Sequence, residues 1–216
     1  MVITYGSSGK MSKLQRSSSV EETFYEHMAQ FLKEKDAKTV VEVGSDVQLR
    51  LAAALSPHCR KFYSVNFPED HARMQGWYGM ARDMGSATNL ELLSGNAVEL
   101  PNMIDHANVI VLQNVLIDGN GRDTELMWQY RRGEKPCSDD DWTNLWERFD
   151  TAEVNAYRGF LQVADHIVRF ARPEPDGRFR SMLIDTLGIP LSKIQTKEIL
   201  YDGTRDVWEA HFIDNS

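Results

Sequence analysis

The stretch Thr39-Val40-Val41-Glu42-Val43-Gly44 decides the expected fold. Its β-branched, mostly apolar residues have the composition of a buried strand in a parallel sheet. Gly44 ends this strand, and the segment from Val47 to Leu55 predicts a helix directly after it. A strand, a glycine turn and a helix in this order predict the opening of an α/β domain.

The same alternation of strands and helices continues along the first half of the chain. Further strands are expected at Phe62–Val65, Leu90–Leu93 and Val109–Leu112, and helices at Val20–Lys35 and Pro68–Met84. Repeated strand-helix-strand units form parallel sheets that are covered by helices on both faces. We therefore expect a Rossmann-like, mostly parallel seven-stranded sheet.

The second half of the chain contains an expected insertion and the end of the sheet. Residues from Gly119 to about Arg148 are polar and predict an insertion with short helices, in which Trp128, Trp142 and Trp146 form either a satellite core or an aromatic wall. The remaining predictions are a helix at Thr151–Ala171, a fifth strand at Phe179–Ile184, and an antiparallel edge hairpin of Glu198–Tyr201 and Val207–Ile213 around Asp202-Gly203.

Composition limits the domain organisation. With 216 residues the chain suits one domain, expected at 20–216 after a polar, flexible arm at 1–19. No apolar run approaches the ~20 residues of a membrane span, and the arm has no apolar signal segment, so we expect a cytoplasmic protein without a membrane partner.

Composition also limits the partners. A net charge of −8 argues against a nucleic-acid partner. A local basic patch remains an alternative, but we interpret the neighbouring arginines as solvated charge: Arg131, Arg132, Arg169, Arg172, Arg178 and Arg180. The two cysteines and six scattered histidines lack the spacing of metal ligands, so no metal site is predicted.

The predicted binding site lies after the strands. Ligands of open parallel sheets bind beyond the carboxyl ends of the strands, where the strand order reverses. The residues expected there are Gly44, Ser45, Asp46, Asn66, Phe67, Asn96, Ala97, Gln113 and Asn114. Glu42 joins them, because a charge inside an apolar strand needs a partner or a ligand.

The order of these motifs resembles the class I S-adenosylmethionine-dependent methyltransferases over about residues 20–213. Val40–Gly44 is similar to the family's first motif, Phe62–Asn66 to its second strand, and Leu92–Ala97 to its third. Val109–Leu116 is similar to the fourth motif, and Phe160 through Ile184 to the fifth unit. The resemblance implies S-adenosylmethionine as cofactor and a small-molecule methyl acceptor, with Asn66 facing the ribose and Asn96 facing the adenine.

Several positions differ from the family's pattern. Asp46 and Gln48 stand where glycines are usual, and Asn66 and Asn96 stand where carboxylates are usual. These replacements favour an alternative, a non-catalytic relative that binds a partner or another metabolite. A nucleotide-dependent oxidoreductase is a third hypothesis, opposed by the missing GxGxxG fingerprint. No residue pattern identifies a catalytic acid, base or nucleophile, and none indicates the oligomeric state.

Overall fold

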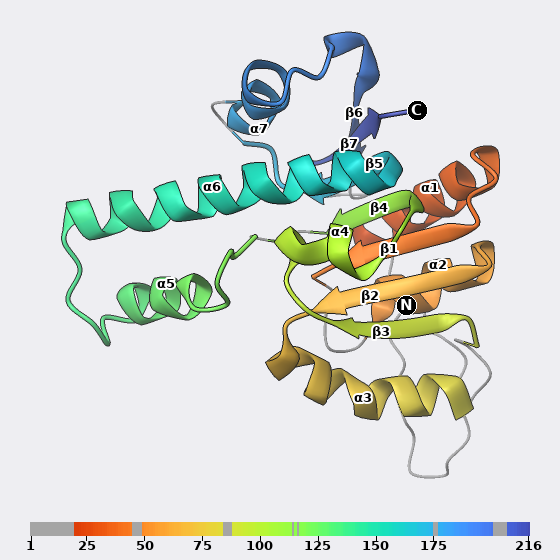
Figure 1. Cartoon of the computed structure of the whole chain (residues 1–216), viewed down its shortest axis with the longest axis horizontal. Coiled ribbons are helices and arrows are strands. Elements are labelled where there is room, and N and C mark those ends of the chain that lie inside the picture. The colour runs from red at the N-terminus through yellow and green to blue at the C-terminus, as the bar shows by residue number, and fades with distance from the viewer. Residues whose placement is uncertain are drawn as a thin grey trace.

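The computed structural model describes residues 20–44, 49–83, 88–113, 115, 117–174, 177–200 and 207–216. Strands alternate with helices in chain order (Figure 1). The strands are β1 (Thr39–Val43), β2 (Lys61–Asn66), β3 (Leu90–Ser94), β4 (Ala107–Gln113), β5 (Ala164–Ala171), β6 (Ile194–Leu200) and β7 (Val207–Asp214). The helices are α1 (Val20–Glu34), α2 (Arg50–Leu55), α3 (Pro68–Asp83), α4 (Leu100–Met103), α5 (Asp123–Arg131), α6 (Asp139–Val163) and α7 (Arg178–Ser181). Short helical turns are η1 (Ser56–His58), η2 (Ala97–Glu99), η3 (Met182–Thr186) and η4 (Leu191–Lys193).

The seven strands form one sheet in the order β3-β2-β1-β4-β5-β7-β6. The first five strands in this order, β3-β2-β1-β4-β5, pair in parallel. Strand β7 is antiparallel to both β5 and β6. This arrangement confirms the predicted Rossmann-like sheet and its antiparallel end. The turn predicted at Asp202-Gly203 lies outside the described residues.

Helices cover both faces of the sheet, and each face has its own core. Strand β1 shows why: four of its five residues are buried, so its side chains pack on both sides. Val40 packs with Phe24 and Leu51 beneath α1 and α2, while Val41 packs with Tyr157 beneath α6. The strand that decides the fold therefore anchors both cores.

Helix α6 is longer than predicted and begins inside the expected insertion. Ser138 and Asp141 form a capping box, in which the Asp141 N–H donates to Ser138 Oγ at 3.2 Å and the Ser138 N–H donates to Asp141 Oδ2 at 2.9 Å. The three aspartates from Asp139 to Asp141 thus stabilise the first turn of a helix instead of marking a loop. The predicted helix start at Thr151 is wrong by twelve residues.

The two halves of α6 pack against different partners. Its second half packs on the sheet, while its first half extends past the carboxyl ends of the strands beside α5 (Figure 1). We call α5 and this first half, residues 123–150, the helical arm. Met127, Leu145 and Phe149 are its buried core, and Trp142 and Trp146 pack against them. Trp128 is 44% exposed. The satellite-core alternative therefore holds for two of the three tryptophans.

The predicted positions of the fifth strand and of the helix before it are wrong. The helix expected to reach Ala171 ends at Val163, and Ala164–Ala171 is β5. The segment 179–184, expected as a strand, lies in α7 and η3. Both stretches alternate short apolar runs with charged residues, and periodicity cannot separate strand from helix over so few residues. Pairing with β4 and β7 makes Ala164–Ala171 the strand.

We predict that the satellite core stabilises the helical arm locally. Leu145→Ala should lower the free energy of opening of the arm by about 2–4 kcal/mol, because a fully buried leucine loses its packing. Amide hydrogen exchange in α5 would report this as faster exchange. Trp128→Ala is the control and should change the free energy of opening by less than ~0.5 kcal/mol, because that side chain is already partly solvated. Equal effects of the two variants would contradict the packing described here.

Candidate functional site

The carboxyl ends of the parallel strands converge at one edge of the sheet, which we call the C-edge. Strand order reverses between β1 and β4, where ligands of open α/β sheets bind. The pairing of Val43 with Leu112 brings Gly44 next to Gln113 across this switch point. Residues that are distant in the sequence thus meet where the fold predicts a site.

Buried polar groups approach the switch point from β1 and β2. Glu42 is 2% exposed and Asn66 is 7% exposed. The Asn66 amide donates to the hydroxyl of Ser64 at 3.3 Å, and its backbone carbonyl accepts from the Gly95 N–H at 2.8 Å. Asn66 is therefore held at the junction of β2 and β3 through both its side chain and its backbone.

Helix α1 contributes residues to the switch point that sequence reasoning missed. The Tyr25 hydroxyl donates to Gln113 Oε1 at 3.2 Å. Burial raises the pKa of Tyr25 well above its ordinary value, and the nearby Glu21 and Glu42 act in the same direction, so the phenol stays protonated. Arg50, the first residue of α2, lies 3.6 Å from Glu21. No local pattern marks Tyr25 or Arg50, because both reach the site only through the packing of α1 and α2.

Gly44 has a structural reason to be glycine. Its φ of +72° is costly for residues with a side chain, and a Cβ atom placed on it would lie 2.6 Å from Val115 Cγ2. The space beside Gly44 is thus occupied by Val115 from the segment after β4. This contact packs Gly44, directly after β1, against the segment that follows β4.

The loop between β4 and α5 contacts the ends of β2 and β3. Asn96 Nδ2 donates to the Gly119 carbonyl at 2.8 Å, while Asn96 Oδ1 accepts from the Val98 N–H at 3.1 Å and caps η2. A Cβ on Gly121 would lie 3.5 Å from the Phe67 ring. Ala97 is buried in the core beneath α6. The side chain of Asn96 therefore has two structural tasks.

Asp118 organises this loop. It is buried, and its carboxylate accepts from the N–H groups of Asn120, Gly121 and Thr124 at 2.8–3.0 Å. Asp118 is not among the predicted site residues. An Asp followed by Gly-Asn-Gly is a signal for a side-chain-stabilised turn, and it marks the position where the chain leaves β4 for the helical arm.

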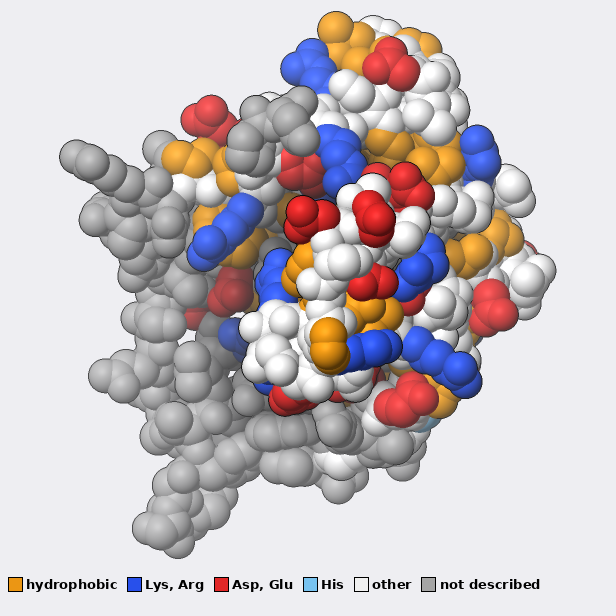
Figure 2. Space-filling view, turned by 90° about the vertical axis from the view of Figure 1, so that its left-hand side faces the viewer, with side chains coloured by type: hydrophobic (Ala, Val, Ile, Leu, Met, Phe, Trp, Pro, Cys, Tyr) orange, Lys and Arg blue, Asp and Glu red, His pale blue; other side chains and the backbone are white. Residues whose placement is uncertain are grey.

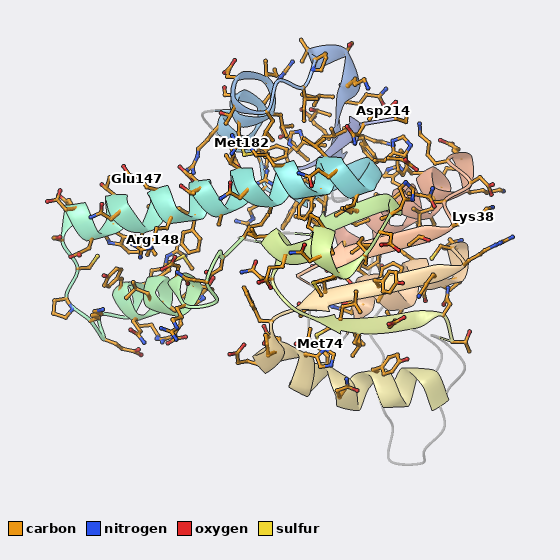
Figure 3. The ribbon with its side chains drawn as sticks, in the orientation of Figure 1. Lys38, Met74, Glu147, Arg148, Met182 and Asp214 are labelled. Carbon is orange, nitrogen blue, oxygen red and sulfur yellow. The ribbon has the colours of Figure 1, made fainter. Side chains whose placement is uncertain are left out.

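A polar groove lies between α5 and α6 beside this loop, with a cavity volume of about 660 Å³. Arg148 lies on the side of α6 that faces α5, where its guanidinium pairs with the buried Asp123 at 3.0 Å (Figure 3). The outer surface of the arm carries side chains of both charges (Figure 2). The helical arm extends beyond the C-edge, as expected for a segment that follows the fourth strand (Figure 1).

The environment of Arg169 differs from the prediction. Arg169 in β5, expected to be solvated, has a side chain only 13% exposed. Its Nη2 donates to Glu174 at 2.6 Å, and its guanidinium lies over the Phe179 ring at 4.2 Å. Burial raises the pKa of the neighbouring Glu153. The interpretation as solvated charge is wrong for Arg169, because α6 and α7 cover this part of the sheet.

Three predicted site residues, Ser45, Asp46 and Asn114, lie outside the described residues. Within the described part of the chain, no group of three or more His, Cys, Asp or Glu side chains is placed to hold a metal ion. In the same part, no helix has the length and apolarity needed to cross a membrane.

No protein-family model and no curated protein matches the sequence, but solved structures match the fold. The N-methyltransferase NodS from Bradyrhizobium japonicum WM9, in complex with S-adenosyl-L-homocysteine, aligns with a TM-score of 0.57 and 12% identity over 92% of this chain and 89% of that chain. An rRNA methylase from Streptococcus thermophilus aligns with a TM-score of 0.55 and 10% identity over 93% and 99% of the two chains.

A third structure carries a different activity in its name. Precorrin 8w decarboxylase from Methanobacterium thermoautotrophicum aligns with a TM-score of 0.51 and 15% identity over 87% and 89% of the chains. The chain thus has the Rossmann-like fold of solved methyltransferases. Because one fold serves several activities, the function has to be argued from the site.

We predict that the contact between Gly44 and Val115 determines the stability of the switch point. Gly44→Ala should lower the free energy of unfolding by about 1–3 kcal/mol, through its positive φ and the steric clash. Urea denaturation would measure this loss. In the Val115→Ala background the two closest contacts, to the Cγ atoms at 2.6 and 2.8 Å, are removed, while the contact to Cβ at 3.3 Å and the φ cost remain, so the same change should destabilise less. Equal losses in both backgrounds would contradict the role of Val115.

Proposed function

We propose that the chain is an S-adenosylmethionine-dependent methyltransferase that acts on a small-molecule acceptor. The observation that supports this most is the row of polar residues along the C-edge in the strand order β3, β2, β1, β4. Asn96 follows β3, Asn66 ends β2, and Glu42 and Gln113 flank the switch point. This order suits a ligand that extends from an adenine through a ribose to an amino-acid end.

The residues present fit this cofactor in charge as well as in position. The Asn66 amide can accept a hydrogen bond from a ribose hydroxyl. Glu42 provides negative charge in β1, which suits an ammonium or a sulfonium and disfavours a phosphate. Arg50 provides a positive group at the start of α2 for a carboxylate. A zwitterionic ligand with an additional cationic centre matches this mixture better than a dinucleotide does.

The chain's own residues act by binding and alignment. The bound cofactor supplies an activated methyl group on a sulfonium. Tyr25 stays protonated and Gln113 is neutral, so neither serves as a general base at the switch point. Positioning of an acceptor that has its own lone pair is sufficient for transfer, because alignment alone lowers the barrier substantially. The polar groove beside the loop from Gly119 to Asp123 is the proposed entry for that acceptor.

A second candidate is a methyltransferase-like binding protein without catalysis. It is favoured by Asn96, whose amide already caps η2 and holds the Gly119 loop. In this case the C-edge would bind a partner or another metabolite. Calorimetric titration with S-adenosylmethionine and S-adenosylhomocysteine separates the candidates, because only the first predicts saturable heat with both ligands.

We predict that Asn66→Asp tightens the binding of both cofactor forms about fivefold, or ~1 kcal/mol, because a carboxylate accepts stronger, charge-assisted hydrogen bonds from ribose hydroxyls. Calorimetry would measure the change in Kd. Asn102→Asp adds the same charge at an exposed position of α4 and should leave Kd unchanged. If the wild type gives no heat with either ligand and Asn66→Asp gains none, the methyltransferase proposal is wrong.

A further inference from the structure

The hydrogen bond between Tyr25 and Gln113 fixes which end of the Gln113 amide is available to a ligand. The Tyr25 hydroxyl is protonated and donates to Gln113 Oε1 at 3.2 Å. An amide has an acceptor oxygen at one end and two N–H donors at the other. Once the oxygen is bound by Tyr25, the donors point away from α1. The Gln113 side chain makes no other hydrogen bond with the described part of the chain.

The sheet order indicates which part of the cofactor meets these donors. In the proposed function Asn96 after β3 faces the adenine and Asn66 at the end of β2 faces the ribose. Neighbouring strands lie ~4.8 Å apart, so a ligand that continues along the C-edge brings its amino-acid end to β1 and β4. Gln113 at the end of β4 lies beside Gly44 at that point. A carboxylate is the group of this end that accepts hydrogen bonds.

We propose that Tyr25 is a positioning residue that turns the Gln113 amide so that its Nε2 donors bind the α-carboxylate of the cofactor's methionine moiety. This inference rests on the proposed function. It assigns to α1, a helix before the sheet, a part in recognising the amino-acid end of the ligand. Tyr25 is 7% exposed and packs with the core beneath α1, so it holds the amide from a rigid position.

The charged residues near Tyr25 and Gln113 suit both ends of an amino acid, its ammonium and its carboxylate. Glu42 is buried in β1 beside the switch point and is matched to an ammonium, while Arg50 at the start of α2, which lies 3.6 Å from Glu21, adds positive charge near Tyr25. Gln113 itself is neutral, so its contribution to binding depends only on where its Nε2 donors point. The hydrogen bond from the Tyr25 hydroxyl to Oε1 fixes the orientation of these donors.

The test compares two ligands that differ only in the amino-acid end. S-adenosylhomocysteine carries the α-carboxylate, whereas 5′-methylthioadenosine has the same adenosine and thioether without it. Gln113→Met keeps the side-chain size and removes the donors, so it should weaken S-adenosylhomocysteine binding ~10-fold and leave 5′-methylthioadenosine unchanged. Tyr25→Phe should weaken S-adenosylhomocysteine ~3- to 10-fold, again without effect on 5′-methylthioadenosine. Calorimetry on the full chain measures each Kd.

Two further variants show whether Tyr25 acts through Gln113. In the double variant the loss should equal that of Gln113→Met alone, because Tyr25 has no amide left to orient. Gln113→Glu keeps an oxygen acceptor for Tyr25 but presents a negative group to the ligand, and should weaken S-adenosylhomocysteine more than Gln113→Met does. Tyr78→Phe is the control, since the Tyr78 hydroxyl donates to the Leu90 carbonyl at 2.9 Å at the opposite end of β3.

The outcomes separate this inference from the proposed function. If the wild type binds neither S-adenosylmethionine nor S-adenosylhomocysteine, the proposed function fails and the inference fails with it. If the wild type binds and the variants weaken both probes equally, Tyr25 and Gln113 are merely structural and the inference alone is overturned. Additive losses in the double variant overturn it as well. Selective, non-additive loss of S-adenosylhomocysteine binding supports it.

Discussion

The parallel pairing of β1 with β4 is the constraint on which the rest of the structure depends. The register from Val40 with Val109 to Val43 with Leu112 brings together two strands that are separated by more than sixty residues. It creates the point where strand order reverses, and it sets Gly44 beside Gln113 and against Val115. The two cores on either side of the sheet both include residues of these strands. Polar side chains therefore meet at the C-edge because the middle of the sheet is apolar and closely packed.

Helix α6 connects the sheet to the helical arm, because its two halves pack against different parts of the structure. Its buried stripe changes partner along one continuous helix, from Met127 of the helical arm to the strands beneath Tyr157 and Phe160. Asp118 and Asn96 join the start of the arm to the C-edge through hydrogen bonds to backbone groups. The polar groove and the proposed cofactor site thus share one loop, so an acceptor in the groove would contact the same segment that touches Phe67 and Asn96.

The chemistry of the C-edge is that of amides and a few carboxylates. Asn66, Asn96 and Gln113 are neutral groups whose proposed part in binding would depend on their orientation, in contrast to the charged acceptors expected from the methyltransferase pattern. In this chain the orientation comes from neighbours: Ser64 for Asn66, the Gly119 carbonyl for Asn96 and the Tyr25 hydroxyl for Gln113. In the proposed site, small shifts in the packing of these neighbours would therefore alter ligand recognition without any substitution of Asn66, Asn96 or Gln113 themselves.

The sequence by itself determined the class of fold and the first half of the sheet, because short, mostly apolar runs with a glycine or asparagine at or just after their ends give a local signal at β1, β2, β3 and β4. It also indicated that Gly44, Asn66, Asn96 and Gln113 follow these strands, since parallel strands share one carboxyl edge. Only the tertiary structure decided that Ala164–Ala171 is β5 and that 179–184 is helical, because pairing with β4 and β7 outweighed an ambiguous periodicity. It also decided that Tyr25 reaches Gln113 from eighty-eight residues away and that Arg169 is buried, because contacts between distant helices and strands leave no trace in local sequence.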